Sequence, residues 1–347
     1  MKRKLAYSML NLLMVLMALS LAVLIPSGAL TEDARMRYEA LQEPAQSPDD
    51  EEESYDRSAV QPVAVLASAA MSDILPAANI DPLPLDLTAP GNAPIEANYT
   101  DSGYRDESII VSLEQLREYD SDVFVAYVKI ATPSQIRTAI AGTKLSSTRT
   151  NHTTTICDNY NGIVAINGDF YSDPNVSGGY IVRQCEVYRE KASANLDLLV
   201  IDELGDFHIL PRGKESQQNS LDAIKSAHQI VNCFFFGPAL VVDGVQAEMP
   251  EKYAFAPGAK NPRAGIAQLD VLTSALVVVN GRTDASAGVT MEEFASIMTK
   301  IGAKQAYNLD GGNSATLAFR GQVYNDKPQD ERAVADIVYF ASAAGQE

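Results

Sequence analysis

Basic residues are scarce in this sequence of 347 residues. Lys and Arg number 27 against 45 Asp and Glu, which gives a formal net charge of −18 at pH 7. Nucleic-acid binding depends on clustered Lys and Arg that neutralise phosphates, so the charge balance argues against a nucleic-acid partner. The acidic charge is concentrated in residues 31–60, where ten acids stand against three arginines. A run of this kind is typical of a solvated tail and not of a binding surface.

Cysteine and histidine are also few, with three of each in the chain. Cys157, Cys185 and Cys233 cannot all pair within one chain, so they do not form a disulfide framework. We expect buried free thiols, with a bridge between Cys157 and Cys185 as the alternative. The sequence has no Cys-x-x-Cys or His-x-x-x-His spacing that would indicate a zinc site.

Residues 1–30 are predicted to contain a membrane segment. Three basic residues at positions 2–4 precede residues 5–25, which carry no charge. A run of about 20 apolar residues can cross a bilayer, whereas the apolar core of a cleaved signal peptide is usually about 7–15 residues long. The length favours a signal-anchor that contacts the membrane through residues 5–25, and the basic start places the N-terminus in the cytoplasm. A signal peptide cleaved near 27–29 is the alternative, and both interpretations export the rest of the chain.

Residues 31–99 are predicted to be an acidic, proline-rich linker. They contain eight prolines and a run of five consecutive acids at 49–53. Such a composition cannot bury enough apolar surface to fold, and it keeps a chain extended. We therefore expect a disordered tether that holds the following residues, 100–347, away from the membrane.

Residues 100–347 carry the signals of a folded domain. Short apolar runs bounded by turn residues predict many strands, among them 163–167 and 305–309. The clearest helix is predicted over 290–301, where a threonine can cap the first turn and Gly302 follows the last. Many strands and few helices predict an α+β fold, built as a single domain around a mixed sheet.

One of the predicted strands ends in a carboxylate that stands directly before two glycines, at residues 308–312 (Asn-Leu-Asp-Gly-Gly). Adjacent glycines can adopt backbone conformations closed to other residues, and successive N–H groups in such a turn can form a concavity that holds an anion. A carboxylate beside such a concavity suits a site that cleaves a phosphate or a sugar. A structural hairpin is the alternative, because Asp-Gly and Gly-Gly are common turn pairs.

The same stretch resembles the signature of the phosphodiester glycosidase family, which includes the uncovering N-acetylglucosaminidase and bacterial exopolysaccharide-associated proteins. The resemblance extends over residues 100–347, because four further segments resemble family elements in the expected order. They are 165–171 (Ala-Ile-Asn-Gly-Asp-Phe-Tyr), 236–240 (Phe-Gly-Pro-Ala-Leu), 261–265 (Asn-Pro-Arg-Ala-Gly) and 325–332. The resemblance implies an exported hydrolase that cleaves the bond between the anomeric carbon of a sugar and a phosphodiester, in a cell-surface glycan or glycolipid.

The resemblance and the residue types together define the candidate site. Asp310 and Asp169 are the candidate catalytic carboxylates, since glycosidic bonds are usually broken by two carboxyl groups. Arg263 is the third catalytic candidate, because a guanidinium can bind two phosphate oxygens at once. The candidate substrate-binding residues are Asn167, Gly168, Asn308, Gly311, Gly312 and Ser314.

Two other classes of function remain open. One is a glycan-binding module that keeps the fold without the chemistry and works in exopolysaccharide assembly. The other is a serine hydrolase that uses Ser314. The residues around Ser314 lack the closing glycine of a hydrolase nucleophile elbow, and His152, His208 and His228 show no local partner pattern.

The expected reaction requires no cofactor. Asp284 and Glu331 are nevertheless candidate ligands for a divalent cation such as calcium, which prefers carboxylate oxygens. The sequence leaves the presence of a metal undecided.

Overall fold

The computed structural model describes one compact part of the chain. The described residues are 71, 75, 80–145, 149–169, 179–192, 195–251, 253, 257–327 and 330–345. The chain divides into two units, 1–61 and 62–347, and every described residue belongs to the second. The predicted membrane segment and most of the predicted linker lie outside the described residues. Within the described ranges, no helix is long and apolar enough to cross a membrane.

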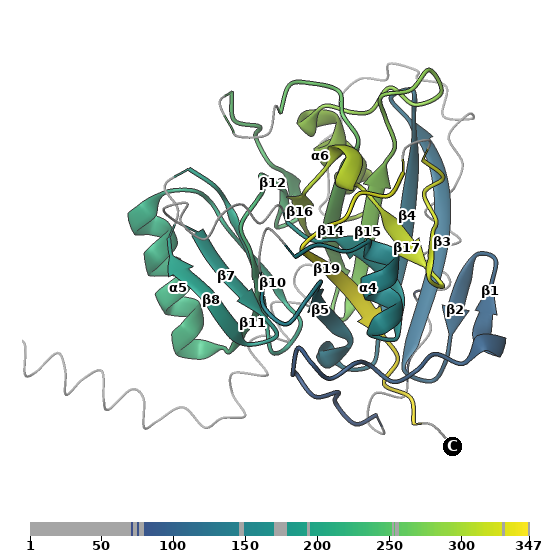
Figure 1. The fold of residues 1–347 in the computed structure, drawn as a ribbon. Helices are drawn as coiled ribbons and strands as arrows, with labels where there is room; N and C mark the ends of the chain where they lie inside the picture. Colours follow the sequence, from purple (N-terminus) through teal and green to yellow (C-terminus); the bar gives the residue numbers. More distant parts are fainter. Residues whose placement is uncertain are drawn as a thin grey trace, which may run out of the picture. The chain divides into compact units, whose positions relative to one another are not determined.

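The largest sheet has nine strands (Figure 1). In spatial order they are β1 (Tyr99–Thr100), β2 (Gly103–Arg105), β3 (Ile109–Glu118), β4 (Ser121–Ile130), β15 (Thr273–Val279), β14 (Arg263–Asp270), β16 (Gln305–Leu309), β12 (Ala239–Val242) and β13 (Val245–Gln246). Strands β14 and β16 are antiparallel, with Ala264 opposite Leu309. Arg263 and Asp310 are the next residues outward on these two strands, so the pairing brings them to the same edge of the sheet.

A second sheet has five strands. Their order is β10 (Phe207–Leu210), β9 (Leu198–Asp202), β11 (Ile230–Phe234), β7 (Gly179–Arg183) and β8 (Glu186–Lys191). Side chains alternate between the two faces of a strand, and β9 uses both faces for packing. Leu198 and Val200 pack with Leu221 of α5 (Lys214–Ala227), and Leu199 and Ile201 join the core that the sheets share.

The third sheet also has five strands. Their order is β18 (Gln322–Val323), β17 (Leu317–Phe319), β6 (Gly162–Asn167), β19 (Asp336–Ala341) and β5 (Ile136–Ile140). Helix α4 (Thr153–Asn159) covers one face, where Ile156 and Cys157 pack against Ala165 and Tyr339. The other face enters the shared core, which contains Phe124 of the nine-stranded sheet, Phe234 of the second sheet and Ile166 of the third.

Helix α6 (Met291–Lys300) confirms the clearest helix of the sequence analysis. Thr290 Oγ1 accepts the N–H of Glu293 at 3.1 Å, and the Glu293 carboxylate accepts the N–H of Thr290 at 2.8 Å, which is a capping box. The helix packs on the nine-stranded sheet. Three short 3-10 turns complete the described structure: η3 (Glu96–Asn98), η4 (Pro133–Gln135) and η5 (Gly312–Ser314).

The predicted mixed sheet is wrong. Every strand pair that the described residues form is antiparallel. Many successive strands are joined by short turns, as β3 is to β4 and β14 to β15, and a short turn can join only antiparallel neighbours. The domain is mostly β, with three α-helices among its described residues.

The end of the predicted linker packs on the domain. Leu83 is buried in the core of the third sheet, and its N–H donates to Ser134 Oγ at 2.8 Å. Asn92 forms a bridge with Ser342. Gly91 lies so close to the last sheet strand that an added Cβ would be 2.1 Å from Ala341 Cβ. Here the structure differs from the expected extended tether, because leucines spaced among the prolines provide apolar surface that is buried.

We expect Leu83→Ala to destabilise the domain by about 2–5 kcal/mol, as is usual when a buried leucine is truncated. The measurement is urea unfolding of the full-length chain. Leu204→Ala is the matched control, because Leu204 is 53% exposed and its truncation should change the free energy of unfolding by no more than about 0.5 kcal/mol. Equal midpoints for the two variants would show that burial of Leu83 adds nothing to stability.

Candidate active site

A cavity of about 390 Å³ opens where β14 begins and β16 ends. Its lining residues are Phe236, Asn261, Arg263, Arg282, Asn308, Asp310, Gly311, Gly312, Asn313 and Arg332. Five of these are site residues predicted from the sequence: Arg263, Asn308, Asp310, Gly311 and Gly312. The described lining carries three arginines and one carboxylate, so its net positive charge favours an anionic ligand.

Asp310 follows β16 and is held from the backbone. Its carbonyl oxygen accepts from Asn167 Nδ2 at 2.7 Å, and its N–H donates to the carbonyl oxygen of Gly168 at 3.3 Å. Burial raises the pKa of the Asp310 carboxyl, although a hydrogen bond from Ser314 and the charge of Arg332 favour the ionised form. A carboxyl with a raised pKa is a better proton acceptor when ionised than an ordinary carboxyl.

The two glycines after Asp310 form a tight turn, and their N–H groups are used inside it. Gly311 donates to the Asp310 carboxylate, and Gly312 donates to the Pro262 carbonyl oxygen at 2.9 Å. A Cβ on Gly311 would lie 2.6 Å from the same Pro262 oxygen, which explains why the turn requires glycine there. The positive charge that faces the cavity therefore comes from the arginines and not from these amides.

Arg263 and Arg282 approach the cavity from two different segments. The buried Arg263 guanidinium donates to the carbonyl oxygens of Ala259 at 2.7 Å and Val289 at 3.1 Å. Arg282 donates from Nη2 to Asn261 Oδ1 at 2.8 Å. Burial, together with the nearby positive charge of Arg282, lowers the pKa of Arg263 to about 10. Arg263 is thus charged at neutral pH, and an anion placed beside it would offset the unfavourable effect of its neighbour.

Asn308 lines the cavity and has a buried acceptor atom. Its Nδ2 donates to the Gly237 carbonyl oxygen at 2.7 Å, which fixes the orientation of the amide. Its Oδ1 is buried and has no hydrogen-bond partner within the described part of the chain. Such unpaired polar atoms are rare in native structures. A ligand hydroxyl would satisfy this oxygen.

Asp169 is not among the residues that line the cavity, and it belongs to a buried ion network. Its Oδ1 is 2.5 Å from Nη2 of Arg183, and its Oδ2 accepts the N–H of Phe235 at 2.7 Å. Nε of Arg183 is in turn 2.6 Å from Oδ2 of Asp336. Burial raises the pKa of Asp336 despite the arginine beside it. Both oxygens of Asp169 are therefore engaged away from the described cavity lining.

The remaining predicted site residues are also absent from the cavity lining. Asn167 Oδ1 accepts the N–H of Thr316 at 3.2 Å. Gly168 packs against the network, since an added Cβ would be 2.3 Å from Asp336 Oδ1. Ser314 is buried, and its hydroxyl hydrogen-bonds the Asp310 carboxylate.

The histidines do not support a serine hydrolase. His152 lies 3.9 Å from Glu331, His208 lies 2.8 Å from Asp202, and His228 lies 3.3 Å from Glu203. Each ring is thus paired with a carboxylate on a segment other than that of Ser314.

The two residues considered for calcium are not brought together as a ligand group. Asp284 is exposed, and the Glu331 carboxylate accepts from Thr154 Oγ1 at 2.6 Å. All three cysteines are free, with Cys157 and Cys233 buried.

Sequence reasoning missed four charged residues that define the site: Arg183, Arg282, Arg332 and Asp336. Arg183 and Asp336 do have a local signal, because each is a charge at the end of an apolar strand. Arg332 lies inside the segment at 325–332 that resembles the family. Arg282 has no such signal, since it occupies a turn beyond β15 at a left-handed φ of 64°.

We expect Arg183→Met to destabilise the domain by about 3–5 kcal/mol, because it leaves two buried carboxylates without their counter-ion. Urea unfolding measures the effect. Arg320→Met is the control, since Arg320 forms an exposed ion pair with Glu96 and such pairs contribute only about 0–1 kcal/mol. A small loss of stability for Arg183→Met, similar to that of the control, would contradict this view of the network.

Comparison with known proteins agrees with the resemblance seen in the sequence. The model of the phosphodiester glycosidase family matches residues 160–341, or 182 of the 347 residues. The catalytic domain of zebrafish N-acetylglucosamine-1-phosphodiester alpha-N-acetylglucosaminidase, auto-inhibited by its pro-peptide, superposes with a TM-score of 0.53 and 16% identity. The match covers 67% of this chain and 83% of that one.

Two further proteins are similar to parts of the chain. A hypothetical protein from Synechocystis matches with a TM-score of 0.46 and 17% identity, over 67% of this chain and 62% of that one. The SPbeta prophage-derived uncharacterized protein YomE of Bacillus subtilis (strain 168) is 33% identical over 108 residues, which are 31% of this chain and 17% of YomE. The chain thus spans a small part of the length of this curated relative. The family match over more than half of the sequence shows that the chain belongs to the phosphodiester glycosidase family.

Proposed function

We propose that this protein hydrolyses the bond between the anomeric carbon of a sugar and a phosphodiester. The observation that carries the proposal is the placement of Asp310 among Arg263, Arg282 and Arg332 around one cavity. A sugar 1-phosphodiester has the matching groups, namely an anion for the arginines and hydroxyls for polar acceptors. Membership of the phosphodiester glycosidase family supports the same chemistry.

The phosphate end of the substrate would lie against the arginines. Arg263 is the most rigid of the three, because it is buried and held by two backbone carbonyls. A guanidinium can bind two phosphate oxygens at once. The sugar end would lie toward Asn308, whose unpaired Oδ1 can accept a hydrogen bond from a sugar hydroxyl.

Asp310 would act as the general base. It takes a proton from a water molecule as the water oxygen bonds to the anomeric carbon. The bond from that carbon to the phosphate oxygen breaks, and its electron pair leaves with the phosphate. The arginines stabilise the charge that grows on the departing oxygen. The products are a sugar with a free anomeric hydroxyl and a phosphate monoester, with the proton left on Asp310.

One carboxylate is enough for this reaction, because the departing phosphate is stable as an anion and needs no proton. Most glycosidases use a second carboxyl group to protonate the leaving oxygen. Asp169 would contribute differently here, by holding Arg183 and the N–H of Phe235 beside the cavity-lining Phe236.

We also propose that the domain works outside the cell, on a glycan or glycolipid at the cell surface. This proposed location is supported by the sequence alone, in which basic residues 2–4 precede the uncharged run at 5–25. N-terminal sequencing of the protein from membrane and medium fractions tests this. A mature chain that starts near residue 31 and is recovered from the medium would replace the anchor with a cleaved signal peptide.

The function is tested by assaying the full-length chain against a panel of sugar 1-phosphodiesters. We expect release of phosphate monoester, and a loss of rate of about 10²–10⁴-fold in Asp310→Asn, as is usual when a general base is removed. Asp284→Asn is the matched control, because Asp284 is exposed and outside the cavity. The melting temperature of Asp310→Asn should not fall, since the change removes a charge that burial disfavours.

Other outcomes of the same assay distinguish the alternatives. Tight ligand binding without turnover by the wild-type chain would indicate a binding module. Covalent labelling of Ser314 by a fluorophosphonate would indicate a serine hydrolase. An Asp310→Asn variant as active as the wild type would remove Asp310 from the mechanism.

We expect Arg332→Gln to move the acid limb of the kcat/KM profile to higher pH. The charge of Arg332 favours the ionised form of Asp310, so its loss should raise the pKa of that carboxyl further. A general base acts when ionised, so activity is lost as pH falls through this pKa, and a higher pKa means loss at a higher pH. Arg320→Gln, at an exposed ion pair with Glu96, should leave the limb in place. A shift to lower pH, or none, would show that Asp310 is not the titrating base.

A further inference from the structure

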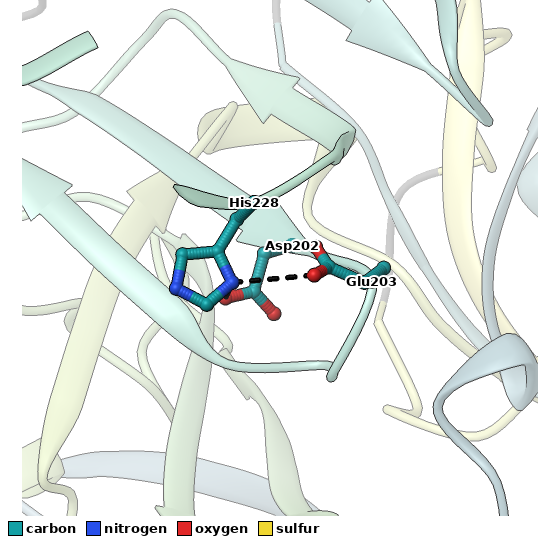
Figure 2. Close-up of side chains that lie close together, drawn as sticks. All are labelled: Asp202, Glu203 and His228. Carbon is teal, nitrogen blue, oxygen red and sulfur yellow. Dashed lines mark hydrogen bonds and ion pairs between the residues drawn. The ribbon is translucent and has the colours of Figure 1, made fainter. Parts of the chain in front are cut away.

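We propose that Asp202, Glu203 and His228 bind a zinc ion. Figure 2 shows the three side chains pointing toward one another from the end of β9, the turn after it and the residue that follows α5. One ligand atom from each lies within 4.8 Å of the others. None of the three lines the cavity that contains Asp310, so this site is independent of the proposed hydrolysis.

The spacing of the ligand atoms suits a tetrahedral ion. His228 Nδ1 lies 3.3 Å from Glu203 Oε1 and 3.6 Å from Asp202 Oδ2. Zinc bonds to nitrogen and carboxylate oxygen are about 2.0–2.2 Å long, which places neighbouring ligands of a tetrahedron roughly 3.3–3.6 Å apart. Two of the three ligand pairs thus already have the separation of a tetrahedral zinc site, and the two carboxylates offer oxygen atoms within 4.8 Å of each other.

The backbone holds each carboxylate so that one oxygen remains for an ion. Asp202 Oδ1 accepts the N–H groups of Leu204 at 2.9 Å and Asp206 at 3.0 Å. Glu203 Oε2 accepts the N–H of Gln229 at 2.7 Å. The other oxygens, Asp202 Oδ2 and Glu203 Oε1, are the ones that face His228. Outer hydrogen bonds of this kind orient metal ligands.

A second histidine supports the same oxygen of Asp202. His208 Nε2 lies 2.8 Å from Asp202 Oδ2, and its ring centre is 5.9 Å from that of His228. A carboxylate oxygen has two lone pairs, so Oδ2 can accept from His208 and still bind an ion. His208 also lines a second cavity, of about 360 Å³. We therefore assign His208 as a residue that positions the Asp202 carboxylate. A water molecule would occupy the fourth coordination position of the zinc ion.

The residue types favour zinc over calcium or magnesium. Imidazole is a common zinc ligand, whereas calcium and magnesium are bound by oxygen atoms alone. The side chains of His228 and Glu203 are 32% and 35% exposed, while that of Asp202 is 1% exposed. An ion can thus enter from solvent past His228 and Glu203 and meet a buried carboxylate behind them.

The test is a titration of the metal-stripped, full-length chain with Zn²⁺ in competition with a chromophoric chelator. We expect one tightly bound Zn²⁺ per chain. His228→Gln and Glu203→Gln should each weaken binding by about 100-fold or more, whereas His208→Gln should weaken it by about 10–100-fold, as is usual for loss of an outer partner. The control is His152→Gln, because His152 also lies beside a carboxylate but is 53% exposed and outside the cluster. This variant should bind Zn²⁺ as the wild type does.

Two further measurements keep the result decisive. Melting of the metal-free variants by circular dichroism shows whether each is folded, and a folded Glu203→Gln variant decides the matter if His228→Gln unfolds. Substitution with Co²⁺ should give the visible absorption of a tetrahedral site in the wild type and not in the ligand variants. A wild-type chain that binds no Zn²⁺, or folded ligand variants that bind it equally well, would overturn the proposal and leave these side chains as ordinary ion pairs. Loss of binding in His152→Gln would overturn it as well.

Discussion

The site depends on one buried cation, the Arg183 guanidinium. It ends β7 in the second sheet and joins Asp169, just beyond β6, to Asp336, the first residue of β19. Breaking such a pair leaves an uncompensated charge in a low-dielectric interior, which is strongly destabilising. Arg183 therefore links the two five-stranded sheets through a buried ion network, beside the bond from Thr138 Oγ1 to Asn232 Oδ1 that also joins them. Through Asp169 the same link holds the N–H of Phe235, next to the cavity-lining Phe236.

In the absence of a ligand, the charged groups around the cavity lower the stability of the folded domain. Burial and the nearby Arg282 disfavour the charged form of Arg263, and burial disfavours the ionised form of Asp310. The unpaired Oδ1 of Asn308 adds a further cost, because it has lost water without gaining a partner among the described residues. The proposed substrate, an anionic sugar derivative, would offset these terms by bringing negative charge to the arginines and hydroxyls to Asn308. Unfavourable contributions of this kind to the free energy of folding are typical of functional sites.

The sequence predicts local features of this protein better than long-range ones. The strand, carboxylate and glycine pair at 305–312 were found where they were predicted, and the family was confirmed. The mixed sheet was wrong because strand direction depends on which segments pair, and periodicity within one strand carries no such information. Asp169 was predicted beside Asp310 in the reaction, but its oxygens are engaged by Arg183 and Phe235, which come from β7 and from just beyond β11.

The glycine turn acts as a scaffold and not as the anion holder. Its N–H groups are used on Asp310 and on Pro262, so the turn fixes the carboxylate and the approach of β14. The positive charge around the cavity comes instead from Arg263, Arg282 and Arg332, which lie on three separate segments of the chain. Side chains can change without disturbing a backbone turn, whereas a Cβ on Gly311 would collide with Pro262. In the proposed mechanism, the group that performs the chemistry is thus separate from the groups that would select the substrate.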